Sequence, residues 1–492
     1  MKKFYITTPI YYPTAKPHLG TAYTTIAADI LARWHKLLEE DVFFLTGTDE
    51  HGEKLAEVAK KSGKSPKEYV DKLVIEFKDV WKKLDINYDR FIRTTDADHK
   101  KVVYEFIKRI KKDIYKGVYE GLYCVGCEAY LTEKDIVNCE CPLHPGKKLE
   151  KIKEETYFFK LSNYKDKLLE LYNKNPDYIL PEKRAKEIIN RVKDGLKDLS
   201  ITRSKLKWGL PYPYDKDHTI YVWFDALLNY FTGIGWPDKK YEKYWPADIH
   251  LIGKDINWFH CVIWPAMLFS AGIKPAKSIF VHGWWTSKGE KMSKSRGNVV
   301  DPIFIINKYG TDALRYFLFR ETSFGEDGDF NEESLKARYH NELADKLGNL
   351  VSRVCGLLLK NFEGKLGFAT VQDELIDQLQ LDTIKEEMAN LKLDRALASI
   401  FSYVDACNIF IQEKKPWEIK DKKELKNIMY TLVESLRVIS ILLSPFMPET
   451  SESINKQFGF KKGNIKDCEF GLTKSVAIEK PSILFKKIEK EK

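Results

Sequence analysis

Two segments of the chain carry side chains that could bind and act on a nucleotide. Residues 291–295 read Lys-Met-Ser-Lys-Ser, which places two ammonium groups and two hydroxyls between Gly289 and Gly297. Taken alone, such a run is typical of a solvated loop. Far upstream, Pro17-His18-Leu19-Gly20 precedes a stretch with helical spacing, and a helix start offers N–H groups and partial positive charge to a phosphate. The two segments together favour an ATP site.

Each segment suits a particular part of a phosphate-handling reaction. Gly20 allows the backbone to approach the nucleotide, and His18 can donate a hydrogen bond to a phosphate oxygen. Lys291 and Lys294 can supply positive charge to phosphate oxygens, on a loop that can close over bound substrate. Lysines on a loop without an obvious catalytic base suit a reaction that needs positioning and charge stabilisation more than acid–base help. The motifs therefore favour an ATP site, with Mg²⁺ bridging the ATP phosphates.

Four further residues have the spacing of a tetrahedral zinc site. Two residues separate Cys124 from Cys127, and two separate Cys141 from His144. The pattern is typical of a zinc knuckle with four protein ligands, which leaves no open position and is therefore structural. Cys139 lies two residues before Cys141 and could take its place. We predict one structural Zn²⁺ ion that holds its own segment together.

Strand and helix patterns alternate around the first motif. Phe4-Tyr5-Ile6 predicts a strand, apolar residues at helical spacing predict a helix over 22–38, and Val42-Phe43-Phe44-Leu45 predicts a second strand. This β-α-β unit is the building block of a parallel sheet. Because ligands bind outside the carboxyl ends of such strands, the segment ending at Gly20 and the segment Thr46–Gly52 should face one crevice.

Changes of pattern divide the rest of the chain. A Cys-rich stretch and Lys- and Glu-rich helices predict an insertion, after which strand signals return at Thr219–Trp223 and Ile249–Gly253. From about residue 333 helical periodicity dominates. We predict an α/β fold in which a Rossmann-like parallel-sheet domain with a zinc-binding insertion is followed by an all-α bundle. The predicted ranges are 1–113 and 216–280 for the sheet domain, 114–215 for the insertion, 281–332 for the lysine loop and a linker, 333–460 for the bundle and 461–492 for a tail.

Composition is that of a large soluble protein. The chain has 492 residues, 43% hydrophobic and 31% charged, and no stretch approaches the roughly 18 to 20 unbroken apolar residues of a membrane span. Met-Lys-Lys runs directly into a strand-like stretch without a leader pattern, and eight cysteines are too few for a disulfide scaffold. We expect a cytoplasmic protein. A formal charge of +9 is compatible with a nucleic-acid partner, although solubility alone can explain it.

The two nucleotide motifs resemble the paired ATP signatures of class I aminoacyl-tRNA synthetases. His18 to Thr21 corresponds to the His-Ile-Gly-His signature, with Thr21 in place of the second histidine. Thr21 can donate a hydrogen bond but cannot carry an imidazolium charge. The resemblance sharpens to the methionyl-tRNA synthetase family and runs from Thr7–Tyr12 to Lys415–Trp417. The segments that carry it are Gly47–Gly52, Tyr221–Ala226, Gly253–Ile256, Phe259–His260, Trp264–Pro265 and Lys291–Ser295.

The resemblance implies ATP-dependent ligation of L-methionine to tRNA(Met) through a methionyl-adenylate, with release of pyrophosphate and then AMP. It implies His18, Lys291 and Lys294 as catalytic residues, and it places Asp255 nearer the ribose or adenosine. The ATP-binding residues that it implies are Pro17, His18, Gly20, Thr21, Gly253, Asp255, Lys291, Ser293, Lys294 and Ser295.

The resemblance also implies a methionine pocket. Asp49, at a strand end, would pair with the α-ammonium, whereas Glu50 and His51 have no assigned role. Aromatic walls suit a polarizable thioether, and His260 or Tyr12 could donate to its sulfur. Each aromatic residue taken singly could equally be part of an ordinary core. The implied pocket consists of Ile10, Tyr12, Asp49, Trp223, Ala226, Tyr230, Phe259, His260 and Trp264.

The helical C-terminal part should read the anticodon. The resemblance implies Asn349 and Arg353, which lie four residues apart and so share a helix face, together with Trp417 after Pro416. Unstacked anticodon bases are recognised by stacking and by hydrogen bonds to their edges. A helix cap and a buried tryptophan are the structural alternatives. Because little chain follows the bundle, we expect a monomer.

Two other readings remain open from the sequence. The first is a class I synthetase for another amino acid or a smaller adenylyltransferase, although no segment is long enough for an editing domain and a small adenylyltransferase needs no helical bundle. The second is a non-catalytic RNA-binding relative, which a degenerate lysine loop would favour. That loop is intact, and Thr21 is the only suspicious position in the signatures.

Overall fold

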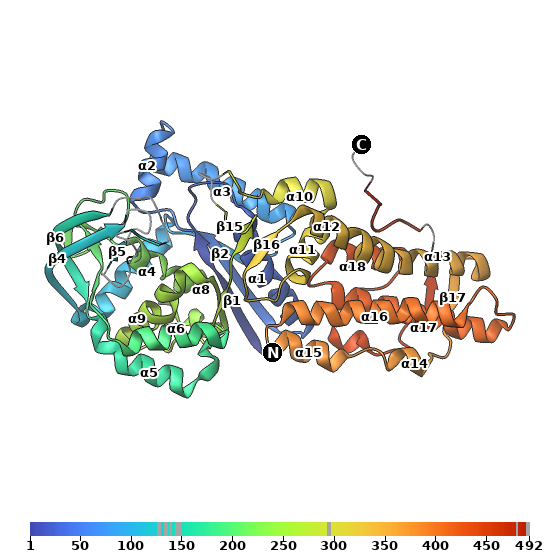
Figure 1. The fold of residues 1–492 in the computed structure, drawn as a ribbon. Coiled ribbons are helices and arrows are strands. Elements are labelled where there is room, and N and C mark those ends of the chain that lie inside the picture. The colour runs from blue at the N-terminus through green and yellow to red at the C-terminus, as the bar shows by residue number, and fades with distance from the viewer. Residues whose placement is uncertain are drawn as a thin grey trace.

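A six-stranded parallel sheet forms the centre of the N-terminal half (Figure 1). The computed structural model describes residues 1–124, 129–131, 136, 140–142, 149–292, 297–478 and 481–488. The strands lie in the order β3-β2-β1-β12-β13-β7, and every neighbouring pair is parallel. Their bounds are β1 (Lys3–Tyr11), β2 (Asp41–Thr48), β3 (Arg90–Arg93), β7 (Ile179–Leu180), β12 (Ile249–Gly253) and β13 (Ser278–His282).

The strand order reverses between β1 and β12. Chain order runs outward from β1 through β2 to β3 on one side, whereas β12 pairs with the other edge of β1. In open parallel sheets the crevice at such a switch point, outside the carboxyl ends of the strands, is where ligands bind. Tyr11 and Gly253 end the two strands at this point. The topology therefore locates the site before any side chain is considered.

Helix α1 (Leu19–Leu37) completes the predicted β-α-β unit between β1 and β2. Its apolar residues, including Ile26, Ile30 and Leu31, are fully buried against the sheet. Helices α2 (Glu53–Lys61) and α3 (Pro66–Lys83) then lead to β3, and α4 (Ala97–Arg109) follows it. The prediction of a parallel sheet built on this unit is confirmed.

The insertion is built on a four-stranded sheet, β5-β4-β6-β8. Helices α5 (Lys165–Lys174) and α6 (Glu182–Lys193) lie between β6 and β8 in the chain, and β7 lies between the two helices. Because β7 pairs with β13, the stretch predicted as insertion also supplies the edge strand of the main sheet. The strands of the insertion are β4 (Ile114–Cys124), β5 (Ala129–Leu131), β6 (Glu150–Phe159) and β8 (Leu199–Ser200).

The strand predicted over Thr219–Trp223 is only partly correct. Thr219 and Ile220 end β11 (Asp215–Ile220), which belongs to a separate sheet with β9 (Thr202–Arg203) and β10 (Pro211–Tyr212). Val222 and Trp223 start the short helix α7 (Val222–Ala226), which α8 (Asn229–Ile234) follows. An apolar run this short is compatible with a strand or a buried helix, so periodicity could not decide. The main sheet resumes with β12, which α9 (Trp264–Ala271) follows.

A small sheet and two helices connect the two halves of the molecule. The sheet consists of β14 (Trp285–Ser287), β15 (Glu290–Lys291) and β16 (Gly328–Phe330). Helices α10 (Pro302–Tyr309) and α11 (Thr311–Arg320) lie between β15 and β16 in the chain. Met292, which follows β15, is buried in the main core.

The C-terminal half is a helical bundle, as predicted (Figure 1). Its central helix is α17, which is buried without interruption from Ile428 to Leu443. The region predicted as a tail contains a strand, β18 (Ser475–Ala477), which pairs with β17 (Lys365–Gly367). The helices are α12 (Glu332–Arg338), α13 (Asn349–Phe362), α14 (Asp373–Ile376), α15 (Leu381–Ala389), α16 (Leu393–Lys414), α17 (Lys422–Leu443) and α18 (Pro448–Phe458), with a π-helical stretch over Tyr339–Gly348.

Candidate active site and anticodon face

His18 caps the N-terminus of α1. Its Nδ1 accepts a hydrogen bond from the backbone N–H of Gly20 at 3.0 Å. A neutral imidazole that accepts at Nδ1 carries its proton on Nε2, so the ring can donate to an oxygen placed at the helix start. The first turn of α1 contains no acidic residue, which leaves its partial positive charge available to an anion.

Thr21 holds His18 in this position. The His18 backbone N–H donates to the Thr21 hydroxyl at 2.9 Å, and that hydroxyl donates to the His18 carbonyl at 2.7 Å. These bonds complete a capping box, in which two backbone groups at a helix end are satisfied reciprocally. The residue that departs from the family signature therefore orients the histidine beside it.

The chain around the lysine loop returns to the start of α1. The backbone N–H of Leu19 donates to the Val300 carbonyl at 3.1 Å, so the segment after the loop lies against the His18 cap. Gly289 and Gly297 both have left-handed backbones, with φ of +73° and +66°, a conformation that glycine adopts without strain. Ser293, Lys294 and Ser295 lie outside the described residues, as does the side chain of Lys291.

The carboxyl end of β12 supplies the other predicted nucleotide residues. A Cβ on Gly253 would lie 2.8 Å from Oδ1 of Asp255, so glycine lets this carboxylate lie close to the backbone. The Asp255 carboxylate accepts a hydrogen bond from Nε1 of Trp284 at 3.3 Å. His282, at the end of the next strand, lies 2.8 Å from the hydroxyl of Thr24 in α1. The ends of β12 and β13 and the first turns of α1 therefore meet at the switch point.

The predicted methionine residues form one aromatic cluster. The rings of Trp223 and Phe259 stack with centroids 3.9 Å apart and planes 7° apart. Both side chains are half-buried, as are Ile10 and Tyr12. Deeper in the cluster, Ala226, Tyr230, His260 and Trp264 are buried.

The hydrogen bonds of His260 determine what it can offer a ligand. Nδ1 lies 3.0 Å from the Ile256 carbonyl, to which it must donate, and Nε2 lies 2.7 Å from the hydroxyl of Tyr230. Burial lowers the pKa of His260 to about 4, so the ring is neutral near pH 7 and Tyr230 donates to it. The Tyr12 hydroxyl donates to the His51 carbonyl at 2.6 Å. Both side chains expected as donors to sulfur are therefore engaged with the protein in this structure.

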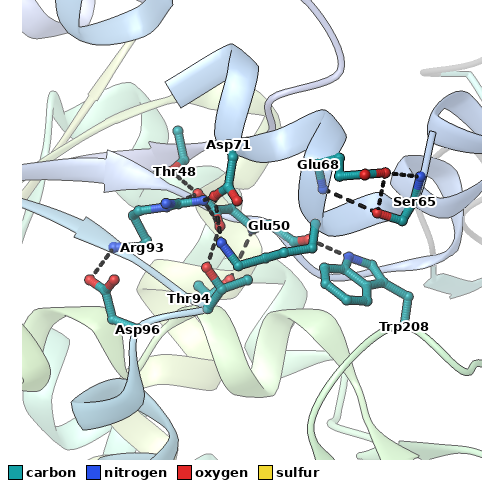
Figure 2. Close-up of polar contacts among 11 residues, drawn as sticks. Thr48, Glu50, Ser65, Glu68, Asp71, Arg93, Thr94, Asp96 and Trp208 are labelled. Carbon is teal, nitrogen blue, oxygen red and sulfur yellow. Dashed lines mark hydrogen bonds and ion pairs between the residues drawn. The ribbon is translucent and has the colours of Figure 1, made fainter. Parts of the chain in front are cut away.

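Glu50, which the sequence left without a role, is fully buried in a polar cluster at the end of β2 (Figure 2). Its carboxylate accepts from Nε and Nη2 of Arg93 at 2.7 and 2.9 Å. The hydroxyls of Thr48 and Thr95 also donate to it, at 2.8 and 2.5 Å. Nη2 of Arg93 also donates to Oδ1 of Asp71 on α3, at 2.5 Å. A buried carboxylate with this many donors fixes the backbone that carries it.

The backbone of Glu50 is held as firmly as its side chain. Its N–H donates to the hydroxyl of Thr94 at 2.9 Å, and its carbonyl accepts from Nε1 of Trp208 at 2.6 Å, as Figure 2 shows. These contacts fix the turn that presents Asp49 and His51 on either side of Glu50. The turn was predicted to face the crevice, but the cluster that fixes it draws on residues distant in sequence.

His51 shares a buried carboxylate with a second histidine. Its Nδ1 lies 2.6 Å from Oδ2 of Asp225, and Nε2 of His99 lies 2.9 Å from Oδ1. Burial alone would raise the pKa of Asp225, but the two imidazoles lower it to about 2. The carboxylate is therefore ionised and accepts from Nδ1–H of His51. Asp225 lies between Trp223 and Ala226 on α7.

Two of the four predicted zinc ligands lie within the described residues. Cys124 ends β4, and Cys124 and Cys141 are both almost fully buried. Buried thiols are the kind of ligand that a soft divalent ion such as zinc takes. Cys127, Cys139 and His144 lie outside the described residues, and among those that are described no group of three ligating side chains comes together.

Two of the three predicted anticodon residues lie in contact. The guanidinium of Arg353 lies 5.9 Å from the ring centroid of Trp417, and its Nη2 donates to Gln412 at 3.3 Å. Trp417 is 45% exposed, so the expected alternative of a buried tryptophan does not hold. Asn349 begins α13 one turn before Arg353 and is exposed. The cation–aromatic pair forms a surface on which a base could stack.

Comparisons with known proteins agree with this architecture. The family model described as tRNA synthetases class I (M) matches residues 4–149 and 143–355, and the model described as anticodon-binding domain of tRNA ligase matches residues 378–490. The second match extends over most of the region predicted as a tail. No helix in the described part of the chain is long and apolar enough to cross a membrane.

Individual relatives are similar over nearly the whole chain. A methionine–tRNA ligase of Caldanaerobacter subterraneus is 47% identical over 100% of this chain and 80% of its own length. One from Thermotoga maritima is 44% identical over 94% of this chain and 76% of its own. Among solved structures, a Mycobacterium tuberculosis methionyl-tRNA synthetase in complex with methionyl-adenylate has 38% identity and a TM-score of 0.95, covering 99% of this chain and 100% of that one.

Proposed function

This chain belongs to the methionine family of class I tRNA synthetases, and we propose that it ligates L-methionine to tRNA(Met) in two steps driven by ATP. The observation that carries the proposal is the meeting of three features at one switch point. These are the His18 cap of α1, the turn of Asp49 at the end of β2, and the stacked Trp223 and Phe259. This arrangement supports a nucleotide site and an aromatic pocket that share one crevice.

The first step joins methionine to the nucleotide. Asp49 is buried and pairs with the α-ammonium, so that the methionine carboxylate is directed at the α-phosphorus. A carboxylate oxygen attacks, the bond from the α-phosphorus to the bridging oxygen breaks, and pyrophosphate leaves. His18 donates from Nε2 to a phosphate oxygen at the α1 terminus, and Lys291 and Lys294 stabilise the charge on the departing pyrophosphate. Bound ATP brings Mg²⁺, which neutralises phosphate charge.

Specificity for methionine comes from the aromatic cluster. The half-buried stack of Trp223 on Phe259 offers a flat apolar wall to a thioether. Neutral His260, held by Tyr230, keeps the floor of the pocket uncharged. Leucine would fill a similar volume but lacks the polarizable sulfur that contacts aromatic rings favourably.

The second step transfers methionine to RNA. A ribose hydroxyl at the 3′ end of the tRNA attacks the carbonyl carbon of the adenylate, and AMP leaves with the bonding electrons. Arg353 and Trp417 bind an unstacked anticodon base at the far end of the bundle, with Asn349 beside them. We infer that Cys124, Cys127, Cys141 and His144 hold one Zn²⁺ ion, which stabilises the insertion without entering the reaction.

ATP–pyrophosphate exchange with each of twenty amino acids tests this function. We expect exchange with methionine alone. Exchange with none would contradict the proposal of an enzyme and favour an RNA-binding relative, and exchange driven by leucine or cysteine would contradict the specificity.

The role of the lysine loop has its own test. Lys294→Ala should slow exchange at least about tenfold, which is about 1.4 kcal/mol of transition-state stabilisation, with little change in methionine affinity. An equal loss of methionine binding would contradict the role assigned to Lys294 in stabilising pyrophosphate.

A further inference from the structure

Two cavities that share Trp208 as a wall lie beside the turn of Glu50. The smaller has a volume of about 280 Å³, and its lining includes His51, Thr94, Thr95 and Lys100. The larger, of about 400 Å³, is lined by Lys60, Lys205 and Lys207 among others. Neither takes part in the methionine cluster or in the nucleotide site described above.

The smaller cavity contains a buried polar group poised for a ligand. His51 is 5% exposed, and its Nδ1 is taken by Asp225. Within the described residues its Nε2 has no hydrogen-bonding partner. The Nε2 atom itself is not fully buried, so it is accessible from the cavity that His51 lines and can bond to a ligand or water there. Because Asp225 fixes the ring, Nε2 is presented to the cavity in a defined orientation.

The rest of the lining favours a phosphate with a base beside it. The cavity includes the first residue of α4, a helix of 13 residues whose N-terminus adds partial positive charge. Lys100 lies one turn further along and is exposed. Lys67 adds a second ammonium, which Asp71 partly offsets at 2.5 Å. The Asp96 carboxylate also lines the cavity, but it accepts from the backbone N–H of Arg93 at 3.1 Å.

Trp208 is suited to stack a base. Its indole N–H is anchored to the Glu50 carbonyl, and its half-buried ring stands edge-on to His51 with centroids 5.6 Å apart. Lysines lie in both cavities that the ring separates, namely Lys100 and Lys67 in one and Lys60, Lys205 and Lys207 in the other. The carboxylates of Glu53 and Glu57 also line the larger cavity and offset part of the positive charge of its three lysines. A fixed aromatic ring between basic surfaces is how proteins bind single-stranded nucleic acid.

The cavity lies next to the place where RNA must arrive. His51 follows Asp49 by two residues at the end of β2, and its carbonyl accepts from Tyr12 of the methionine cluster. Its partner Asp225 lies on α7 between Trp223 and Ala226. The ribose that receives methionine must reach this crevice, and the cavity adjoins it through His51.

We propose that the surface of Trp208, His51 and Lys100 binds the single-stranded 3′ end of the tRNA, with a base on Trp208 and a phosphate at Lys100 and the α4 terminus. The inference rests on the proposed function, since it assumes that tRNA is the second substrate. It assigns a role to His51, which the sequence left open. His51 here is a binding residue for RNA and takes no part in adenylate formation.

Lys100→Ala tests the phosphate contact, with Lys101→Ala as the matched control. Both lysines are exposed on α4, so the two variants lose the same charge from the same helix. We expect Lys100→Ala to raise the KM for tRNA by about threefold to tenfold and to reduce the slope of log(kcat/KM) against log[salt] by about 0.7, the value for one phosphate contact on a single strand. Lys101→Ala should change neither quantity, and both variants should keep wild-type pyrophosphate exchange.

A tRNA shortened at its 3′ end separates this surface from other RNA contacts. The wild-type protein should bind the full tRNA more tightly than the shortened one, and Lys100→Ala should reduce that difference in affinity. Trp208→Phe and Trp208→Leu both lose the indole N–H, so a larger loss of tRNA affinity in the leucine variant isolates the stacking ring.

Three results would overturn the inference. One is normal exchange with an unchanged salt slope in Lys100→Ala. Another is an affinity difference between the two tRNAs that Lys100→Ala leaves intact. The last is a loss in Lys100→Ala of inhibition by inorganic pyrophosphate alone, which would assign the cavity to a free anion. Absence of exchange in the wild-type protein would instead refute the proposed function, so the two failures are distinguishable.

Discussion

Arg315 and Asp29 form an ion pair in which neither side chain is exposed. Nη2 of Arg315 lies 2.7 Å from Oδ2 of Asp29, on the helix that His18 caps. Nε and Nη2 of the same guanidinium also donate to the carbonyls of Phe446 and Pro445, between α17 and α18 of the bundle. One buried pair therefore joins α1 to the helical bundle.

Asp29→Asn should destabilise the protein by about 3 kcal/mol or more, because removing one partner leaves a buried guanidinium uncompensated. Urea unfolding measures the change in the free energy of unfolding. Asp98→Asn is the control, since the pair of Asp98 and Arg90 leaves the carboxylate 53% exposed, and such pairs contribute about 1 kcal/mol or less. Equal losses in the two variants would contradict a special role for the buried pair.

Thr21→Val should impair ATP use more than Thr21→Ser. Valine has the shape of threonine but cannot make either hydrogen bond to His18, whereas serine can make both. Loss of a helix cap costs about 1 kcal/mol, and we expect kcat/KM for ATP in pyrophosphate exchange to fall about fivefold in the valine variant. Equal activity in the two variants would show that the cap does not position His18.

The contribution of three buried histidines to stability should fall as the pH drops from about 6.5 towards 4. Burial lowers the pKa of His260 to about 4 and also lowers those of His250 and His282. The unfolded chain therefore binds protons in this window that the folded protein does not, which favours unfolding. The lowered pKa of His260 alone contributes about 3 kcal/mol to the loss in the free energy of unfolding.

His260→Gln tests the origin of that pH dependence. The variant should show a shallower dependence of the free energy of unfolding on pH between 6.5 and 4, measured by urea titration at several pH values. His250 and His282 remain, so the dependence should be reduced and not abolished. An unchanged slope would show that His260 is protonated in the folded state above pH 4.

Trp417→Ala should weaken tRNA charging and leave pyrophosphate exchange intact. A base stacked on an aromatic ring contributes about 1 to 3 kcal/mol, so kcat/KM for tRNA should fall at least about fivefold. Phe368→Ala removes another exposed aromatic ring of the bundle, 61% exposed, and should have no such effect. Loss of both activities in Trp417→Ala would point to a role in folding.

Zinc analysis of cysteine variants tests the inferred metal site. The purified protein should contain one zinc ion per chain, and Cys141→Ser should lose it together with part of the thermal stability. Cys139→Ser should keep the ion, because the four ligands that we infer, Cys124, Cys127, Cys141 and His144, do not include Cys139. Retention of zinc in Cys141→Ser with loss in Cys139→Ser would exchange the two assignments.

Much of the candidate site could be located from the sequence because short motifs define it. The His18 cap, the turn of Asp49 and the aromatic cluster all lie at positions that local pattern or family resemblance indicated. Prediction failed where the partners are distant in sequence. Periodicity over a short apolar run could not show that Val222 and Trp223 form a helix, and no local signal marked Ile179–Leu180 as an edge strand of the main sheet.

The sequence by itself determined which chemistry this protein can perform, because charged loops, a capped helix and aromatic residues of fixed spacing have few alternative uses together. Only the tertiary structure decided how those groups are held. Glu50 is buried at the centre of its turn through its ion pair with Arg93. His51 is fixed by its hydrogen bond to Asp225 on α7. The physical reason is that burial and pairing depend on which distant segments meet, whereas helix capping and motif spacing depend on neighbours along the chain.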